Sequence, residues 1–491
     1  MGMKLSSLFE NAPNIVIKEL MTDSRAKISG GLFFCVKGML NDGHKFIQQA
    51  KDNGAIAVVH SDSIKEYDPD LTYIQVENVL SALNIVAARF YENCTTKMSV
   101  FGVTGTNGKT TITNLIRNVI NDEVPCGYIG TIGIYYGNVK EEALLTTPDI
   151  VPLHKTLHNM YKAKMKAVSI EVSSIGLELH RCDTIDFNYA IFTNFTHDHL
   201  DFHGTMENYF KSKKMLFDNL SEDAVAVINV DDEIGSKLIE DCDAKVITYG
   251  IDNDADYRAK NLVIAPNGSS FTLIHKNEEY LVKTNLVAKF NIYNLLATIA
   301  TVHDYGLELE TIISKAVNLP QILGRMERID EGQNFTIIVD FAHTPDGVEK
   351  IYQYAREITA KDKRLITVFG SAGRRDVKKR PIFGELSDKY CDLIILTEDD
   401  PREEDPKDIA NEIMKGIIDT PCIFIENRYD AIRQAVEVAN DGDTVVLMGK
   451  GDEQFIYYEH GKHPWLGDHI VAKEVIRKFH FGEGDERNEE E

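Results

Sequence analysis

The chain has 491 residues and a formal net charge of −24 at pH 7, from 53 basic and 77 acidic residues. This length exceeds one ordinary core and predicts two to four domains, and a hydrophobic content of 43% is typical of globular proteins. The acidic balance excludes non-specific nucleic-acid binding, which requires a basic face.

Cysteine usage and hydropathy predict the compartment. The 7 cysteines are dispersed without a Cys-x-x-Cys pair, which favours reduced thiols over a disulfide framework or a zinc site. No apolar run approaches the length of a membrane span, and no long apolar stretch follows a basic cluster near residue 1. We therefore expect a cytoplasmic protein without nucleic-acid partners or membrane insertion.

Residues 1–96 predict a small α/β domain. Apolar runs at 32–36 and 55–59 are typical of strands, and 42–53 predicts a helix between them. The polar group Thr22-Asp23-Ser24-Arg25 precedes these runs. It is suited to contact an anionic ligand, but Asp-Ser also commonly starts turns, so both interpretations stay open.

A nucleotide-binding loop is predicted near the start of a second domain, residues 97–322. The apolar run Val100–Val103 leads into Thr104-Gly105-Thr106-Asn107-Gly108-Lys109-Thr110-Thr111, and a helix-compatible run begins near Thr110. Backbone N–H groups of such a turn cradle phosphates, while Lys109 adds a positive charge and Thr110 a hydroxyl for Mg²⁺. Val103 stands where the usual pattern has glycine.

Alternating strands and helices predict a parallel sheet in this second domain. Strand candidates are 98–103, 167–172, 189–193, 224–230 and 245–249. Ligands lie beyond the carboxyl ends of such strands, which singles out Glu171 as an oxygen ligand for Mg²⁺ beside Lys109. The segment 193–201 combines two histidines with aspartates. Because no cysteine or further spaced histidine accompanies it, a Mg²⁺ and phosphate role is favoured over structural zinc.

Two later segments of this domain allow functional and structural interpretations. The segment 209–217 predicts a basic amphipathic helix, for which a solvated face is the simplest explanation. A helix begins near 290–294, and Asn294 either reaches a nucleotide or caps that helix. Residues 323–328 predict a hinge that carries Arg325, a side chain suited to phosphate.

Residues 323–481 predict a third, Rossmann-like domain, and 482–491 an acidic tail that we expect to be disordered. Strands are expected at 336–340, 366–369, 393–397, 422–425 and 444–448. This domain has no phosphate loop. Charged residues and glycines instead follow four strands, which together predict a site for a small zwitterionic ligand; these segments are 340–346, 370–376, 399–402 and 449–453.

With these motifs in place, the chain resembles the Mur ligase family, ATP-dependent amide-forming enzymes of peptidoglycan precursor synthesis. The resemblance covers nearly the whole chain, with specific motifs in all three domains; they are Asp23–Arg25, 104–111, Leu145–Pro148, Glu171–Ser174, His197–Asp201, Tyr209–Phe217, Asp340–Asp346 and Gly449–Gly451. It implies an N-terminal α/β UDP-substrate domain, a central ATP-binding domain with the phosphate loop and a C-terminal amino-acid-binding domain. The implied reaction adds a diamino acid to UDP-N-acetylmuramoyl-L-alanyl-D-glutamate through an acyl phosphate, in a monomeric bacterial enzyme that uses ATP and Mg²⁺.

The resemblance also implies roles for individual residues. ATP would be held by Gly105, Thr106, Asn107, Gly108, Lys109, Thr110, Thr111, Asn294, Arg325 and His343. The UDP-substrate would contact Ser24, Thr146, Thr147, Ser173 and Arg181. The amino acid would contact Arg375, Asp399, Asp400, Pro401, Arg402, Gly449 and Glu453. Mg²⁺ would be held by Thr110, Glu171, His199 and Lys213, the last as a carbamate, a role that replaces the solvated-face interpretation of its helix. The catalytic group would be Lys109, Glu171, His199 and Lys213.

The incoming amino acid is inferred from one arginine. Arginine binds carboxylates bidentately, so Arg402 favours meso-2,6-diaminopimelate, which has a second carboxylate that L-lysine lacks. The family pattern more often has asparagine at the position of Asp400, and Glu403, Glu404 and Asp405 add acidity nearby. L-Lysine therefore stays the alternative substrate.

Three positions depart from the family pattern. Ile175 and Asp452 replace histidines, and Leu179 replaces a glutamine. Leu179 weakens the prediction of the UDP-substrate site, and Asp452 weakens the identification of the amino acid. None of the three departures affects the residues expected to transfer phosphate.

Two other functions are weighed against the ligase. A folylpolyglutamate synthase or cyanophycin-type ligase is disfavoured by Asp23–Arg25 before the phosphate loop. A catalytically silent nucleotide-binding paralogue is disfavoured by the presence of Lys109, Glu171, His199 and Lys213.

Overall fold

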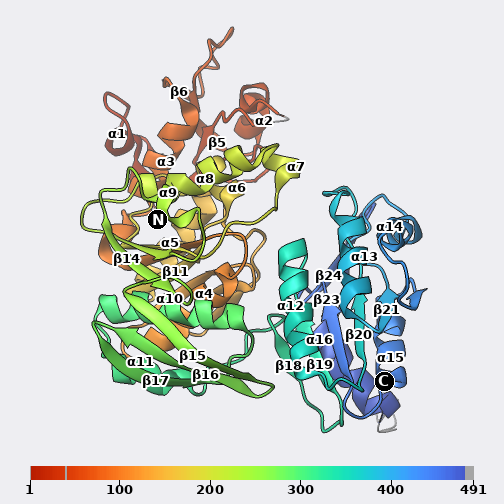
Figure 1. Ribbon diagram of the computed structural model, residues 1–491. Coiled ribbons are helices and arrows are strands. Elements are labelled where there is room, and N and C mark those ends of the chain that lie inside the picture. Colours follow the sequence, from red (N-terminus) through yellow and green to blue (C-terminus); the bar gives the residue numbers. More distant parts are fainter. Residues whose placement is uncertain (1, 39–40, 481–491) are drawn as a thin grey trace, which may run out of the picture.

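The computed structural model describes residues 2–38 and 41–480, so the expected acidic tail at 482–491 lies outside the described residues. Three large sheets with their own helices follow one another along the chain, which confirms the three-domain α/β class (Figure 1). Our boundaries at 96/97 and 322/323 stay predictions. Among the described residues, no helix combines the length and apolar character needed to cross a bilayer.

The first sheet contains four parallel strands, in the order β3 (Glu19–Met21), β4 (Gly31–Phe34), β5 (Ala55–His60) and β6 (Thr72–Gln75). The expected helix at 42–53 begins as a 3₁₀ turn, η1 (Gly43–Phe46), and continues as α2 (Ile47–Asp52). The remaining elements of this region are β1 (Met3–Lys4), α1 (Leu5–Leu8), β2 (Val16–Ile17), α3 (Val79–Phe90) and η2 (Cys94–Lys97).

The central sheet has eleven strands, in the order β10-β9-β8-β11-β7-β12-β13-β14-β15-β16-β17. From β8 to β15 neighbouring strands are parallel, and antiparallel hairpins extend both edges. The five strands expected from sequence are confirmed to within one or two residues as β7 (Ser99–Thr104), β11 (Ala167–Glu171), β12 (Tyr189–Phe192), β13 (Val225–Asn229) and β14 (Lys245–Gly250). The strands toward the two edges of the sheet were not predicted; they are β8 (Cys126–Gly130), β9 (Gly133–Tyr136), β10 (Val139–Glu141), β15 (Tyr257–Ala265), β16 (Gly268–His275) and β17 (Glu278–Thr284).

Helices cover both faces of the central sheet, and this explains the continuous apolar run of β7. Phe101 and Val103 pack in a core with α4 (Lys109–Ile120), α10 (Lys289–Tyr305) and α11 (Leu309–Ala316). Val100 points to the opposite core, which contains α5 (Ile150–Lys162) and α8 (Met206–Asp218). The short helices of this region are α6 (Ser174–Glu178), α7 (Leu200–His203) and α9 (Gly235–Leu238).

The third sheet has the order β18-β19-β23-β20-β21-β22 and is parallel except for β18. The strands expected from sequence are confirmed as β19 (Thr336–Asp340), β20 (Leu365–Phe369), β21 (Leu393–Leu396), β22 (Cys422–Phe424) and β23 (Thr444–Met448). Not predicted were β18 (Glu327–Ile329) and the hairpin β24 (Phe455–Tyr458) with β25 (Gly461–Pro464). One face packs against α12 (Pro345–Ile358), α13 (Lys379–Tyr390) and α14 (Pro406–Met414), and the other against α15 (Arg428–Val438) and α16 (Asp468–Val475), which η3 (Ile476–His480) extends.

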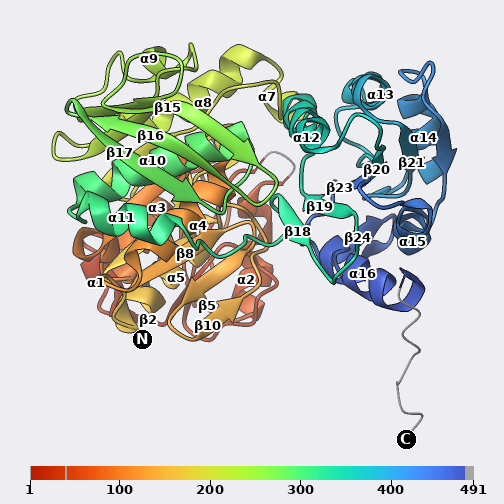
Figure 2. The ribbon, with the colours of Figure 1, turned by 60° about the horizontal axis from the view of Figure 1, so that its bottom comes forward.

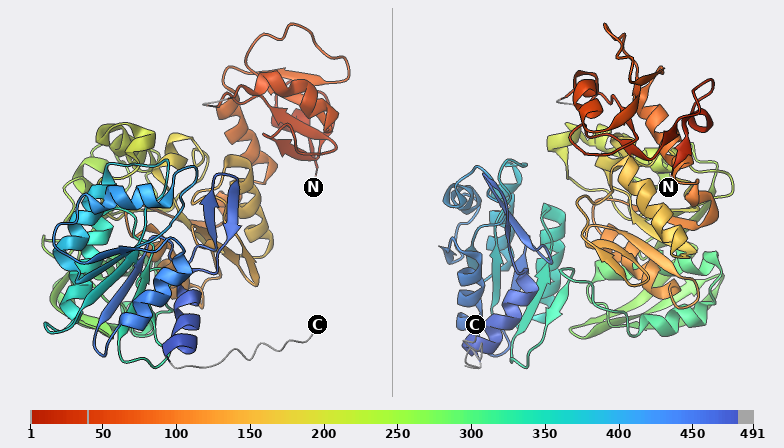
Figure 3. Two further views of the ribbon diagram at one scale, coloured as in Figure 1. Left: turned by 90° about the vertical axis from the view of Figure 1, so that its right-hand side faces the viewer. Right: turned by 180° about the vertical axis from the view of Figure 1, so that it is seen from behind.

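The C-terminal region stands beside the central one, with α12 and the β18 edge turned toward it (Figure 2). The N-terminal region packs instead on α5, because Ile150 and Val151 belong to its core. The right-hand view of Figure 3 shows the N-terminal region at one end of the central region and the C-terminal region along its side. The two larger sheets therefore bring the loops at their strand ends to a common boundary.

Candidate functional site

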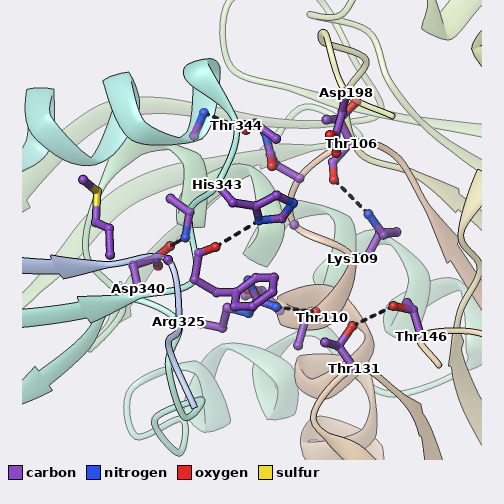
Figure 4. Close-up of a pocket in the computed structure, with 18 of the residues that line it drawn as sticks. Thr106, Lys109, Thr110, Thr131, Thr146, Asp198, Arg325, Asp340, His343 and Thr344 are labelled. Carbon is purple, nitrogen blue, oxygen red and sulfur yellow. Dashed lines mark hydrogen bonds between the residues drawn. The ribbon is translucent and has the colours of Figure 1, made fainter. Parts of the chain in front are cut away.

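A cavity of about 1350 Å³ lies between the central and C-terminal regions. The loops after β7, β11 and β12 line it from one side, and those after β19, β20, β21 and β23 from the other. Figure 4 shows Lys109 and Asp198 on the first side and His343 and Asp340 on the second. Most residues expected at the site line this cavity. Four do not: Gly105, Lys213, Ser24 and Pro401.

The loop before α4 has the geometry of a phosphate cradle. Gly105 has φ 149° and Gly108 has φ 88°, values that L-residues with side chains rarely adopt. A Cβ would come within 1.8 Å of Thr193 Oγ1 at Gly105 and within 2.6 Å of Asn294 Oδ1 at Gly108. Only glycine therefore permits the close packing of this loop.

Lys109 lies over the same loop. Its Nζ donates to the Gly105 carbonyl at 3.0 Å and to the Thr106 carbonyl at 2.8 Å. Burial lowers the pKa of Lys109 despite the opposing charges of Glu171 and Asp198. The ammonium group is thus held at the point where phosphate oxygens would replace carbonyl oxygens.

Glu171 is fully buried at the end of β11 and gathers hydroxyl groups around one carboxylate. It accepts hydrogen bonds from Thr110 Oγ1 at 2.9 Å, Tyr128 OH at 2.5 Å and the Thr131 N–H at 2.9 Å. Thr131 Oγ1 in turn lies 3.3 Å from Thr146 Oγ1 (Figure 4). This cluster of oxygen atoms at the phosphate loop matches the ligands that Mg²⁺ prefers.

His199 lies in the loop after β12 with φ 52°. Its Nε2 is 3.2 Å from Asp198 Oδ2, and burial lowers the pKa of His199 to about 4, so the ring is neutral at pH 7. A neutral imidazole is the form that binds a metal ion. In the part of the chain that the structure describes, the His, Cys, Asp and Glu side chains whose ligand atoms lie close enough together to hold one ion are Asp42, His44 and Asp62.

Lys213 on α8 is 1% exposed, so the solvated-face interpretation of this helix is wrong for its central lysine. Its Nζ donates to the Gly105 carbonyl at 2.8 Å and lies 4.6 Å from the ring centroid of Tyr209. Burial, together with the positive charge of Lys109, holds the pKa of Lys213 well below its usual range. Its neighbour Lys211, by contrast, pairs with Glu207 at the surface. A buried amine of this kind is a nucleophile for CO₂.

The C-terminal region contributes Arg325 and His343 to the same cavity. Arg325 Nη2 is 3.4 Å from Thr110 Oγ1, and its guanidinium carbon lies 4.3 Å from the Phe341 ring centroid. Burial lowers the pKa of His343 to about 4. Asn294 lies in the second turn of α10 beside Gly108, so the helix-cap interpretation is wrong.

Residues expected at the UDP-substrate site divide between two places. Ser173 Oγ lies 3.1 Å from Thr147 Oγ1, and Arg181 Nη1 donates to the Thr147 carbonyl at 2.9 Å. Thr147, Ser173 and Arg181 all line the cavity, as do Thr146 and Ile175. Ser24 is separate from them in the N-terminal region, where its Oγ donates to Gln49 Oε1 at 2.6 Å.

The residues expected to hold an amino acid surround a lysine that the sequence reasoning missed. Lys450 is fully buried, and its Nζ donates to Asp400 Oδ1 at 2.7 Å and to Glu453 Oε2 at 2.6 Å. Its place between Gly449 and Gly451 is the signal that could have singled it out. Burial raises the pKa of Glu453 to about 7.

The two arginines of this group differ in their partners. Arg375 Nη1 lies 3.4 Å from Asp201 Oδ2, across the boundary between the two regions. Arg402 has φ 56°, and its guanidinium carbon lies 5.9 Å from the Tyr457 ring centroid. Among the described residues, no carboxylate pairs with Arg402, so its guanidinium can receive one from a ligand.

Three family models match the chain: "Mur ligase family, catalytic domain" at residues 16–91, "Mur ligase middle domain" at 103–302 and "Mur ligase, glutamate ligase domain" at 324–451. The chain is 39% identical over 472 residues to UDP-N-acetylmuramoyl-L-alanyl-D-glutamate–2,6-diaminopimelate ligase 1 of Clostridium acetobutylicum, with 95% of each chain covered. It is 40% identical over 459 residues to the 2,6-diaminopimelate ligase of Clostridium botulinum, covering 92% of this chain and 94% of the relative.

Solved structures share the fold over nearly the full length. A structure of a UDP-N-acetylmuramoyl-L-alanyl-D-glutamate–2,6-diaminopimelate ligase matches with a TM-score of 0.70 at 29% identity, covering 98% of this chain and all of the other. MurF ligase from Thermotoga maritima, in complex with ADP, matches with a TM-score of 0.65 at 19% identity, covering 94% of this chain and 97% of the other.

Proposed function

Since the chain belongs to the Mur ligase family, we propose that it uses ATP to join 2,6-diaminopimelate to UDP-N-acetylmuramoyl-L-alanyl-D-glutamate. One observation carries the proposal. The phosphate loop with Lys109 and the charged loops with Arg375 and Arg402 line a single cavity. A phosphate donor and an amino acid bound there would meet at the boundary of the two regions.

The reaction follows from the poor reactivity of a carboxylate as an acyl donor. The glutamate carboxylate of the UDP-substrate attacks the γ-phosphorus of ATP, which forms an acyl phosphate and releases ADP. The amine of the second substrate then attacks the acyl carbon through a tetrahedral intermediate, and phosphate leaves as the amide forms. Lys109 and Arg325 offset the charge on the transferring phosphoryl group. Closure of the cavity would exclude water that hydrolyses the acyl phosphate.

The residues beside the loop fit Mg²⁺. Thr110, Glu171 and neutral His199 would supply the donor atoms, and Lys213 would add a carboxylate if CO₂ converts its amine to a carbamate. Bound Mg²⁺ supplies positive charge to the phosphate oxygens. Without the ion, Glu171 still orients Thr110 through their hydrogen bond. Cytoplasmic location and a monomeric state stay predictions.

Our candidates for the glutamate end of the UDP-substrate are Thr146, Thr147, Ser173 and Arg181. Thr147 Oγ1 donates to the Glu171 carbonyl, and Ser173 and Arg181 contact Thr147. Thr146 contacts Thr131, which donates to the Glu171 carboxylate. Ser24 would reach the nucleotide end only, since it lies in the N-terminal region. Arg402 is the candidate for the far carboxylate of diaminopimelate. Pro401 does not line the cavity, so its role would be to shape the loop that carries Asp400 and Arg402.

Phosphate release from ATP tests the proposal, measured with the UDP-substrate and meso-diaminopimelate, L-lysine or no amino acid. We expect release with diaminopimelate, and a product whose mass includes that amino acid. Phosphate release with L-lysine but not with diaminopimelate would support the ligase activity and reject diaminopimelate as its substrate. Absence of release with every amino acid would reject the ligase in favour of a nucleotide-binding paralogue.

A further inference from the structure

Lys450 has no role in the mechanism above, yet it is among the most enclosed charged groups of the chain. Its side chain is fully buried in the loop after β23. Besides the hydrogen bonds to Asp400 and Glu453, its Nζ lies 4.0 Å from Asp399 Oδ1. One ammonium group thus faces three carboxylates, and all three line the cavity.

The cluster joins separate elements of the C-terminal region. Asp399 and Asp400 follow β21, whereas Lys450 and Glu453 follow β23. Asp400 Oδ1 also accepts the Tyr457 N–H of β24 at 3.1 Å. Behind Asp399, the charged groups that face the cluster from α15 and α16 are Arg428 and Asp468, which pair with each other.

The charges of this cluster do not balance. Lys450 makes a short contact with two carboxylates and can neutralise only one. Burial raises the pKa of Glu453 to about 7, and the negative charges of Asp400 and Asp399 add to the rise against the opposing effect of Lys450. Glu453 therefore changes its charge near neutral pH.

We propose that Lys450 is a specificity-determining residue: shared between Asp400 and Glu453, it cancels the charge of Asp400 and sets the charge with which Glu453 receives the amino acid. The inference rests on the proposed function and on Glu453, which lines the cavity, facing the ammonium group of the incoming amino acid. Because Asp400 is already paired with Lys450, it does not repel the far carboxylate of diaminopimelate, the group that L-lysine lacks. Arg402 then decides the selection, in favour of a substrate with a far carboxylate.

The pH dependence follows from the same cluster. Below about pH 7 Glu453 is protonated and cannot hold an ammonium group, so KM for the amino acid rises as the pH falls. In Asp400→Asn, the ammonium group of Lys450 pairs with Glu453 alone, and the negative charge of Asp400 no longer repels the Glu453 carboxylate. The pKa of Glu453 then falls by about one unit, and the inflection of KM moves to lower pH by the same amount.

A titration tests the sharing directly and needs no catalysis. The probe is the ¹³C carboxyl signal of Glu453 in the full chain, assigned by its loss in Glu453→Gln. Asp452→Asn is the matched control, because it removes a carboxylate from the same loop without contacting Lys450. We expect a lower pKa in Asp400→Asn and no change in the control. Equal values in all three proteins, or equal shifts in both variants, would overturn the proposal.

Substrate preference is the second test. Lys450→Met leaves Asp400 uncompensated, and we expect the preference for diaminopimelate over L-lysine, as the ratio of kcat/KM values, to fall at least 10-fold. The double variant Asp400→Asn/Lys450→Met removes both charges and should restore the ratio. An unchanged ratio in Lys450→Met, or no recovery in the double variant, would reject the role of Lys450. If the wild-type chain adds no amino acid at all, the proposed function is rejected. The titration still tests the sharing of Lys450 between Asp400 and Glu453, because it needs no catalysis.

Discussion

At the scale of single residues, removal of water decides the chemistry of the cavity. Burial lowers the pKa values of Lys109, Lys213, His199 and His343, and raises that of Glu453. In each case burial favours the uncharged form, and neighbouring charges only modify the result. Neutral His199 can then bind an ion, the amine of Lys213 is favoured for reaction with CO₂, and Glu453 can exchange a proton near pH 7.

Arg402 should select the amino acid by binding the far carboxylate of diaminopimelate. In Arg402→Gln we expect KM for diaminopimelate to rise about 10- to 100-fold, because a hydrogen bond between charged groups contributes about 1.5–3 kcal/mol. KM for L-lysine should stay within about twofold. Initial-rate kinetics with both amino acids measure these KM values. A similar rise of both would mean that Arg402 stabilises its loop and does not bind the far carboxylate.

Lys213 should act only in its carbamate form. Removal of CO₂ and bicarbonate should lower the rate of phosphate release, and added bicarbonate should restore it, because the buried amine loses its carboxylate reversibly. Lys213→Met should be inactive under both conditions. Lys211→Met, two residues away on the exposed face of α8, is the control and should keep the wild-type response. A rate that is insensitive to CO₂ would contradict the carbamate.

At the scale of elements, each site segment is held by the secondary structure on either side of it. The phosphate loop joins β7 to α4 and packs against α10 through Gly108 and Asn294. The two amino-acid loops leave β21 and β23, which are separated by β20 in the sheet. Arg428, at the start of α15, donates to the carbonyls of Glu398 and Met448 and so links the ends of these two strands.

Gly108→Ala should weaken ATP binding. The Cβ would meet Asn294 Oδ1 at 2.6 Å and impose φ 88° on an alanine, at a cost of about 1–3 kcal/mol. We expect KM for ATP to rise about 10-fold or more, with KM for the amino acid unchanged. Gly137→Ala is the control, because Gly137 also has positive φ but its Cβ would meet nothing within 4 Å. Equal effects of both changes would exclude the contact with Asn294 as the cause.

Arg428→Met should destabilise the C-terminal region. Arg428 and Asp468 are both fully buried and joined by hydrogen bonds of 2.7 and 2.6 Å, so removal of one partner leaves an uncompensated charge. The free energy of unfolding should fall by about 3–5 kcal/mol in urea denaturation. Arg433→Met, which breaks an exposed pair with Asp430 on the same helix, should cost less than about 1 kcal/mol. Similar losses for both variants would refute the importance of burial.

At the scale of the whole molecule, few contacts cross the cavity. Asn107 Nδ2 donates to Asp346 Oδ2 at 3.0 Å, His197 Nε2 lies 3.1 Å from Asp376 Oδ2, and Lys462 pairs with Glu142 at 3.1 Å. These contacts connect the phosphate loop and its neighbours to α12 and the C-terminal loops. Substrates that bind both sides would add to them and favour a closed arrangement.

Asp346→Ala should weaken ATP use, because it removes the acceptor that joins the phosphate loop to α12. We expect kcat/KM for ATP to fall about 10-fold, which corresponds to the loss of one hydrogen bond to a charged group. Asp346 also pairs with Lys350 at 2.8 Å within α12, so Lys350→Met is the matched control. If that control lowers kcat/KM equally, the ion pair inside the helix, and not the link between regions, is responsible.

Local patterns determined most of the fold by themselves. Buried parallel strands require continuous apolar runs, so β7, β11 and β23 were predictable, as was the phosphate loop between β7 and α4. Strands with weaker patterns were missed. The meander β15–β17 at the sheet edge alternates buried and exposed residues, and the β24–β25 hairpin is largely exposed, so neither contains a long apolar run.

Only the tertiary structure decided which side chains meet. Lys213 is buried against Gly105, 108 positions away, and Lys450 pairs with Asp400, 50 positions away. Ser24 and Pro401 belong to site motifs but do not line the cavity, and Asn294 lies inside its helix. The physical reason is range: periodicity and turn chemistry act over a few residues, whereas burial and ion pairing depend on how distant segments pack.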